Sequence, residues 1–163
     1  MGVKGDFAKL ARLQAKVKRL ATDDVRVRFA TVMGAEAVAQ VQLGFRESRD
    51  PYGRAWPPLK LRSGKPLLDT GRLRSSFSYR ARPRGFEVGT NFIGAPVHQY
   101  GATIAPKRAK LLRFRAGRKG RWIFAKEVRV PRRQMVPEGR LGSIWSRAFV
   151  ETSKRFFSRL MRP

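Results

Sequence analysis

Apolar residues spaced three or four positions apart predict two helices in the first 47 residues of the chain. The first is expected over residues 6–20, where Asp6 can cap the start. The second is expected from about Thr22 to Glu47, after a capping cluster at residues 22–24. Its expected buried stripe consists of Val25, Phe29, Val32 or Met33, Val38, Val41 and Phe45. Gly34 interrupts this stripe and is expected to weaken or bend the helix.

The middle of the chain has the pattern of loops and short strands. Residues 46–70 carry prolines and glycines without a period, which predicts an extended loop. A short helical turn is expected at 67–74, with Asp69 or Thr70 as its cap. Alternating apolar positions in 75–79 and 86–88, joined by the turn residues 83–85, predict a β-hairpin. Residues 91–108 are expected to form a second extended loop.

The last third predicts a second hairpin and a long helix. Over residues 109–130, apolar runs at 111–114 and 122–124 flank a basic turn, and Val128 and Val130 extend the second strand. A helix is expected over 137–161, with Pro137 in its first turn. Its expected stripe is Leu141, Trp145, Ala148 or Phe149, Thr152, Phe156 and Leu160. The whole order predicts one α+β domain: an antiparallel sheet built from two hairpins, two N-terminal helices, a long C-terminal helix and extended loops.

The chain is strongly basic. Its 163 residues include 37 Lys and Arg against 11 Asp and Glu, a formal net charge of +26. This imbalance points to a negative partner, either nucleic acid or an acidic protein surface in a larger assembly; a solvated basic surface is the third interpretation. In an extended strand Arg113 and Arg115 point to the same face. The basic contact candidates on this second hairpin are Arg113, Arg115, Arg118, Lys119 and Arg121.

No catalytic or metal-binding pattern is present in the sequence. The single histidine, His98, has no acidic neighbour in the sequence, and there is no cysteine. Because acid–base catalysis needs positioned partners, we expect His98 to be structural, and we expect no enzymatic activity and no cofactor. Apolar runs fall far short of the roughly 20 residues of a membrane span. The N-terminus lacks the pattern of a secretion signal, so we expect synthesis in the cytoplasm and no membrane partner.

The aromatic residues divide into core and interface candidates. Trp145 and Trp122 are expected in the core, because they lie on a helical stripe and in an apolar strand. Trp56 lies with Tyr52 in a proline-rich loop, either as an exposed interface anchor or as a staple that ties the loop down. The interface candidates are Tyr52, Trp56, His98 and Tyr100.

Several short motifs follow one another between Phe45 and Arg133. Phe45 is followed by Asp-Pro-Tyr-Gly at 50–53, Trp56 and Leu59. The later motifs are Leu-x-x-Thr-Gly-x-Leu-x-x-Ser at 67–76, Val-Gly-Thr at 88–90, His-Gln-Tyr-Gly at 98–101 and Pro-Arg-Arg at 131–133. This order resembles the phage virion morphogenesis family, the tail-completion proteins of Mu-like and related phages. Gly53, Gly71 and Gly101 are expected to permit tight turns, the first two with positive φ.

The resemblance implies a structural virion protein, made in the host cytoplasm, of the phage neck or tail end that completes the tail and joins it to the head. It also implies a ring of copies of this chain, a hexamer if it matches the tail, beside neighbouring neck, connector or tail-tube proteins. The extended loops and the basic hairpin are then expected to make the contacts between subunits and between rings. The alternative is a basic protein that binds nucleic acid without sequence preference through the hairpin arginines.

Overall fold

The computed structural model describes residues 14, 15, 18, 22–116 and 120–162. Gln14, Ala15 and Lys18 are helical, and the rest of the helix expected over 6–20 lies outside the described residues. The elements in chain order are α2 (Asp23–Glu47), α3 (Arg72–Ser75), β1 (Phe77–Arg82), β2 (Gly85–Thr90), α4 (Ala95–Tyr100), β3 (Ala102–Ile104), β4 (Leu112–Arg115), β5 (Trp122–Ala125), β6 (Val128–Val130) and α5 (Ser143–Leu160). The predicted α+β class is confirmed.

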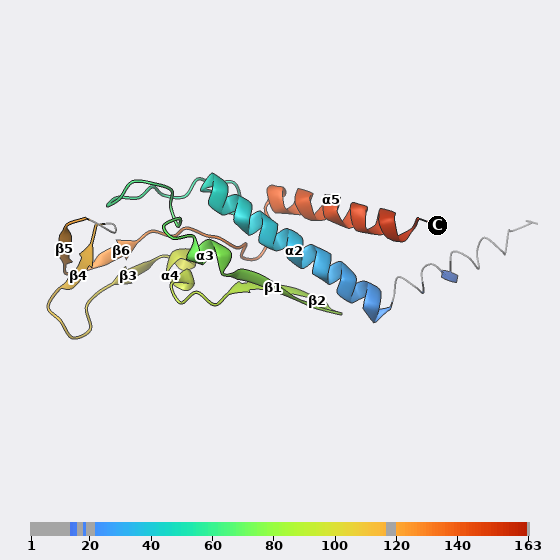
Figure 1. The fold of residues 1–163 in the computed structure, drawn as a ribbon, viewed down its shortest axis with the longest axis horizontal. Coiled ribbons are helices and arrows are strands. Elements are labelled where there is room, and N and C mark those ends of the chain that lie inside the picture. The colour runs from blue at the N-terminus through green and yellow to red at the C-terminus, as the bar shows by residue number, and fades with distance from the viewer. Residues whose placement is uncertain (1–13, 16–17, 19–21, 117–119, 163) are drawn as a thin grey trace, which may run out of the picture.

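The long helix α2 is the centre of the body, with the β1–β2 hairpin against one side and α5 along another (Figure 1). It begins after Thr22, as expected, and ends where Ser48 adopts a left-handed conformation and donates its backbone N–H to the Gly44 carbonyl. Val25, Met33, Val41 and Phe45 of the expected stripe are buried, whereas Val32 is 37% exposed. The central core cluster comprises Ala37, Val41, Phe45, Trp56, Leu73, Phe77, Ala95, Met135 and Trp145.

Gly34 lets α2 and β1 approach each other closely. A Cβ placed on Gly34 would lie 2.5 Å from Cδ2 and 2.8 Å from Cγ of Tyr79 on β1. The glycine therefore has a packing role: it gives the Tyr79 ring a flat helix surface to lie on. This explains why a residue of low helix propensity occupies the middle of a 25-residue helix.

The first hairpin has the predicted form. β1 and β2 are antiparallel, with Phe77 opposite Thr90 and Arg82 opposite Gly85. Phe77 is buried and Phe86 and Val88 are partly buried against the core, so one face of the hairpin covers α2. Successive side chains of a strand point to opposite faces, which leaves the arginines of β1 in solvent.

The second hairpin is also confirmed, but its surroundings differ from the prediction. β4 and β5 are antiparallel, with Arg115 opposite Trp122. β6 does not extend β5; it pairs with β3, so that Ala102 lies opposite Val130 and Ile104 opposite Val128. The stretch 91–108, expected to be an extended loop, therefore contains the helix α4 and the strand β3. The described strands form separate two-stranded sheets.

The last helix starts later than predicted. α5 begins at Ser143 with Gly142 at its N-cap, so Pro137 and Leu141 precede it, and Leu141 is 43% exposed. The segment 131–138 cannot join the helix because its backbone groups bond to α4 and to the loop 49–58. Trp145 and Thr152 of the expected stripe are buried.

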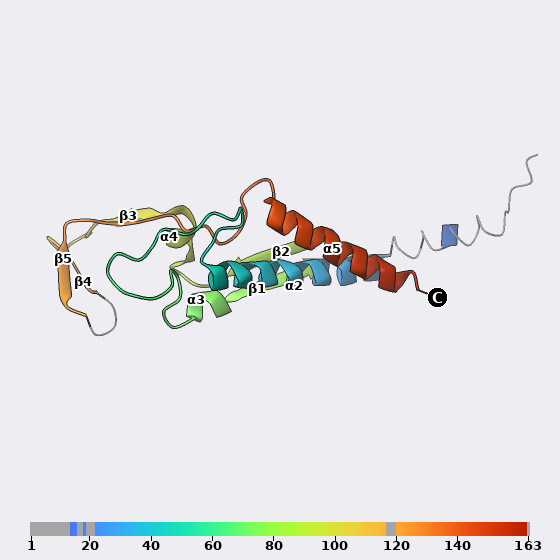
Figure 2. The same ribbon diagram turned by 90° about the horizontal axis from the view of Figure 1, so that it is seen from above.

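The whole molecule is elongated. The β3–β6 and β4–β5 pairs lie at the end opposite the described C-terminus, well away from the paired helices (Figure 2). We call the segment from β3 to β6, residues 102–130, the arm, and the rest of the described chain the body. In the part of the chain that the structure describes, no helix has the length and apolar character needed to cross a membrane.

Candidate functional site

The sequence motifs between Phe45 and Arg133 come together at the junction of body and arm. The first of them, residues 50–53, forms a compact turn. Asp50 Oδ1 accepts the backbone N–H groups of Tyr52 at 2.9 Å and Arg54 at 2.8 Å. Gly53 has a φ of +90°, which confirms the expected positive-φ turn. The aspartate and the glycine of this motif thus have structural roles.

Trp56 ties the following loop to the core. Its side chain is 6% exposed, makes an edge contact with Phe45 at 5.4 Å between ring centroids, and donates its indole N–H to the Gln134 carbonyl at 2.9 Å. The exposed-anchor alternative is therefore wrong and the staple alternative is correct. A surface loop can bury this tryptophan because residues 133–136 lie beside it and supply the acceptor that its N–H requires.

Arg133 holds the same loop from the other side. It is 6% exposed, and its guanidinium donates to the carbonyls of Pro57 and Pro58 at 2.8 and 2.9 Å. Its backbone N–H donates to the His98 carbonyl at 2.7 Å. The last motif, 131–133, therefore links α4 to the loop that carries the first motif.

Gln99 holds this junction together, and it is not among the residues singled out from the sequence. Its buried amide donates to the Val136 carbonyl and to Glu138 Oε1, both at 2.9 Å. Its Oε1 accepts the N–H groups of Met135 at 2.8 Å and Val136 at 3.2 Å. The His-Gln-Tyr-Gly motif marks this glutamine in the sequence. Only the fold shows that its side-chain amide bonds to the backbone groups of residues 135–136, as a neighbouring strand would.

A pocket of about 300 Å³ opens at this junction. Residues from four of the motifs line it, although they are up to 74 positions apart in the sequence. The lining is Leu59, Arg62, Leu67, Asp69, Thr70, Gly71, Arg72, Leu73, Phe92, His98 and Arg133. We call it the motif pocket. Gly71 precedes α3 with a φ of +77°, as expected, and Thr70 Oγ1 accepts the Arg72 N–H at 3.5 Å.

His98 is half-buried in the wall of the motif pocket. Its Nδ1 is buried and has no hydrogen-bond partner in the structure. Burial, and after it the charge of Arg133, lowers the pKa of His98 below the ordinary 6.5. The imidazole is therefore neutral at pH 7. No carboxylate orients it, and no group of three or more acidic or histidine side chains within the described ranges could hold a metal ion.

The two tyrosine candidates lie on the surface near this junction. Tyr52 is 37% exposed, and its hydroxyl donates to the Glu138 carbonyl at 2.8 Å. Tyr100, at the end of α4, is 64% exposed. Gly101 follows it as the expected turn residue, has a φ of +75°, and packs against the backbone of Arg132. Interface roles for Tyr52, Tyr100 and His98 stay predictions.

Three of the five basic contact candidates, Arg113, Arg115 and Arg121, lie among the described residues of the arm. Arg113 and Arg115 place their guanidinium carbons 4.2 and 4.7 Å from the centre of the Trp122 ring. Trp122 is 47% exposed, so its predicted core position is wrong: among the described strands, β4 and β5 form a separate two-stranded sheet. Arg121 is exposed. Arg118 and Lys119 lie outside the described residues.

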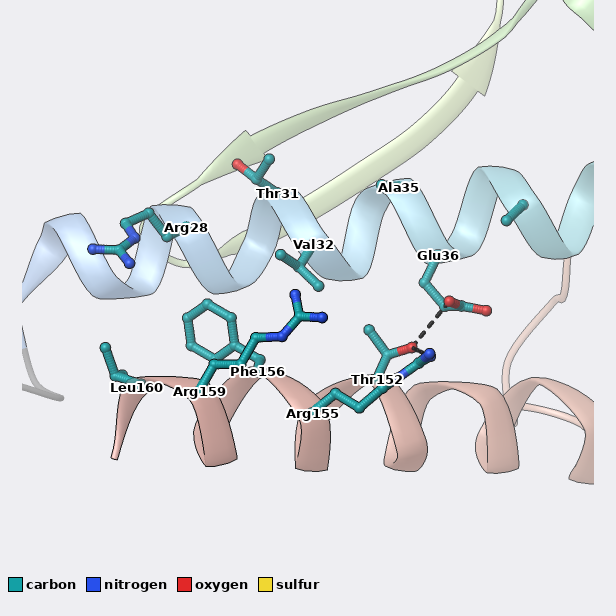
Figure 3. Close-up of a pocket in the computed structure, with 11 residues that line it drawn as sticks. Arg28, Thr31, Val32, Ala35, Glu36, Thr152, Arg155, Phe156, Arg159 and Leu160 are labelled. Carbon is teal, nitrogen blue, oxygen red and sulfur yellow. Dashed lines mark hydrogen bonds between the residues drawn. The ribbon is translucent and has the colours of Figure 1, made fainter. Parts of the chain in front are cut away.

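A second, larger hollow lies between α2 and α5, with a volume of about 840 Å³ (Figure 3). Thr152 donates to Glu36 Oε2 at 2.9 Å across its floor, and Arg28, Arg155 and Arg159 stand around it. The apolar part of the lining comes from Val32, Phe156 and Leu160. Each oxygen of the Glu36 carboxylate accepts a hydrogen bond: Oε2 from Thr152, which joins α2 to α5, and Oε1 from Gln40 within α2.

Comparison with known proteins agrees with the order of the motifs. The model of the phage virion morphogenesis family matches residues 8–140, and the chain belongs to this family. It is therefore a protein of bacteriophage virion assembly, associated with the virion. The match covers the motif pocket and the arm and ends before α5. No curated protein and no solved structure matches the chain.

Proposed function

We propose that this protein is a subunit of a ring at the phage neck or tail end, where it completes the tail and takes part in joining it to the head. The observation that carries the proposal is the arm. A two-stranded sheet on its own is marginally stable in water, and the arm leaves apolar side chains in solvent. Ile104, Leu111, Trp122 and Phe124 are 40%, 42%, 47% and 60% exposed.

These exposed apolar residues support an interface, because monomeric proteins rarely expose grouped apolar side chains without a binding role. Arg113 lies opposite Phe124 and Arg115 opposite Trp122 in the hairpin, so the arm suits a partner surface that is both apolar and acidic. A heterologous contact between the arm of one subunit and the body of the next closes a ring when the rotation permits. The partners in this proposal are copies of the chain and neighbouring neck, connector or tail-tube proteins. In this proposal the protein acts by binding its partners and not by catalysis.

The test is the mass of the purified protein in solution, measured by light scattering at moderate and high salt. We expect a discrete ring, and we expect the Phe124→Ser variant to shift it to monomers, since Phe124 is exposed and its loss leaves the fold intact. Val150→Ser on α5 is the matched control, because Val150 is 51% exposed but lies on the body. A chain that stays monomeric, or a Phe124→Ser ring of unchanged mass, contradicts the ring.

Completion of the tail is tested separately. Tails purified from a phage that lacks this protein are incubated with the purified chain and then with filled heads. Recovery of infectious particles by the wild-type chain and not by Phe124→Ser is the expected result. Recovery with both proteins would show that the arm is not part of the joint.

A second candidate function is sequence-independent DNA binding by the arm, favoured by the pair of arginines on the exposed Trp122 ring. A protein that neutralises several phosphates loses affinity steeply as salt rises. Binding of random duplex DNA that falls with salt, and that Arg113→Gln with Arg115→Gln weakens, would support this function. A wild-type chain that ignores DNA excludes it.

A further inference from the structure

The motif pocket holds more positive charge than its surroundings compensate. Three arginines, Arg62, Arg72 and Arg133, line it against one acidic residue, Asp69. No described carboxylate lies within ion-pair distance of any of these arginines. Buried charges in proteins are usually paired. The pocket therefore lacks an anion that would pair with its arginines.

Arg133 is the centre of this imbalance. Its guanidinium is buried and uses Nε and one terminal nitrogen on the carbonyls of Pro57 and Pro58. Those neutral acceptors orient the group without cancelling its charge. Burial, and after it the charge of Arg62, lowers the pKa of Arg133, as expected for neighbouring cations without an anion between them.

The other two arginines, Arg62 and Arg72, can also bind an acidic group. Arg62 is held by weak bonds of 3.3 and 3.4 Å to the carbonyl of Leu68. The Arg72 guanidinium has no partner among the described residues and is free to turn toward a ligand. A guanidinium suits a carboxylate or a phosphate because its donors form a planar fork.

The rest of the lining decides between these two anions. Leu59, Leu67, Leu73 and Phe92 form apolar walls around the charged groups. A carboxylate on a protein segment brings apolar neighbours that such walls can cover, whereas a nucleic-acid phosphate is carried on a polar backbone. The volume of about 300 Å³ is the size of one or two side chains.

We propose that the motif pocket binds a carboxylate side chain, together with an adjacent apolar residue, from a segment of a neighbouring virion protein. The partner's place in the virion rests on the proposed function, but the site does not depend on ring formation. The bound carboxylate interacts with the arginines that line the pocket, and the apolar neighbour lies against the leucines. The buried charge of Arg133 then has an anion nearby only in the assembled state. Binding of the correct partner therefore stabilises the region around the pocket.

The single histidine allows a direct test on the full chain. When the protein is labelled with ¹⁵N-histidine, the His98 imidazole is the one labelled side chain, and its NMR signals report on the pocket wall. The probe is the blocked peptide acetyl-Gly-Leu-Glu-Leu-Gly-amide, compared with the same peptide carrying Gln for Glu. We expect saturable shifts with the Glu peptide and an affinity at least about tenfold lower with the Gln peptide.

Matched variants separate the pocket from the general positive charge. Arg72→Gln is expected to weaken the Glu peptide at least about fivefold. Arg74→Gln removes the same charge from the same helix but does not line the pocket, so it is expected to leave the affinity within about twofold. Arg72 is exposed, and its loss leaves the fold intact. Arg62→Gln is the second variant from the pocket and is expected to behave as Arg72→Gln does.

Three results would overturn the proposal. Equal affinity for the Glu and Gln peptides would show an apolar pocket only, and equal losses in the two α3 variants would show non-specific attraction. Displacement of the peptide by inorganic phosphate or duplex DNA at equal concentration would assign the pocket to phosphate. The mass of the wild-type protein is measured in the same samples: a monomer that binds the peptide defeats the ring alone, and a ring that does not bind it defeats the carboxylate site alone.

Discussion

At the scale of single residues, the indole N–H of Trp56 is the clearest test of how the loop is held. In the Trp56→Phe variant a six-membered ring is kept, but the pyrrole ring and its N–H are lost, so the buried Gln134 carbonyl loses its donor. We expect the free energy of unfolding to fall by about 1–3 kcal/mol, measured by urea denaturation. Trp122→Phe is the matched control: its ring is 47% exposed, so we expect a change below about 1 kcal/mol.

His98 gives a prediction about pH. Its pKa is lowered in the folded chain, so the unfolded chain binds more protons as pH falls through 6.5 toward the folded value. Stability is therefore fully present above pH 6.5 and declines below it, by less than about 1.4 kcal/mol per pH unit. Urea denaturation at pH 7.5 and 5.5 measures the decline. The His98→Asn variant should lose this part of the pH dependence; the same decline in both proteins would assign it to other groups.

A sequence pattern predicts the conformation or burial of a residue only where its neighbours in the sequence determine that property. The positive φ of Gly53 and Gly71 was predictable because a tight turn needs it locally, and Gly101 was predictable as a turn residue. Trp56 and Trp122 were not, since each occurs in a context that allows either burial or exposure. Residues 133–136 cover Trp56, whereas the Trp122 ring, on which the guanidinium groups of Arg113 and Arg115 lie, stays 47% exposed. Both outcomes depend on segments distant in the sequence.

At the scale of elements, the contact between α2 and β1 depends on Gly34. A glycine-to-alanine change inside a helix normally stabilises it by about 1 kcal/mol. Here the new methyl group overlaps the Tyr79 ring, and we expect a net loss of about 1–3 kcal/mol in unfolding free energy. In a Tyr79→Ala background the same change should become neutral or stabilising. A loss of equal size in both backgrounds would show that the ring is not the cause.

The elements that escaped prediction are short and paired over long distances. α4 has six residues, one of them Pro96, and reads as a turn. β3 and β6 have three residues each and pair across the whole β4–β5 hairpin. A three-residue strand has too few positions to show alternation. The long helices α2 and α5 were predictable because a stripe repeated over several turns is hard to produce by chance.

At the scale of the whole molecule, the arm and the body are joined at one place. β4 and β5 pack mainly on each other. We therefore expect that replacing residues 106–126 with Asn-Gly, which makes β3 and β6 one hairpin, leaves the thermal unfolding midpoint within about 2 °C of the wild type. Differential scanning calorimetry measures this midpoint. A drop of about 10 °C would show that the hairpin stabilises the body.

The formal charge of +26 is spread over both parts, but they use it differently. In the body, ion pairs such as Arg28 with Asp24 and Lys154 with Glu151 are exposed and contribute little. On the arm, arginines stand beside exposed apolar rings. Screening by salt should therefore change association more than folding.

The single junction between arm and body has an evolutionary consequence. Because the hairpin β4–β5 rests mainly on itself, substitutions in it are not constrained by the packing of α2, β1 and Trp56. We therefore expect the arm to diverge with the surface it meets, and packing to make the core and the motif pocket change more slowly. If the arm were exchanged between related chains at β3 and β6, binding specificity would move with it and the fold of the recipient body would stay the same.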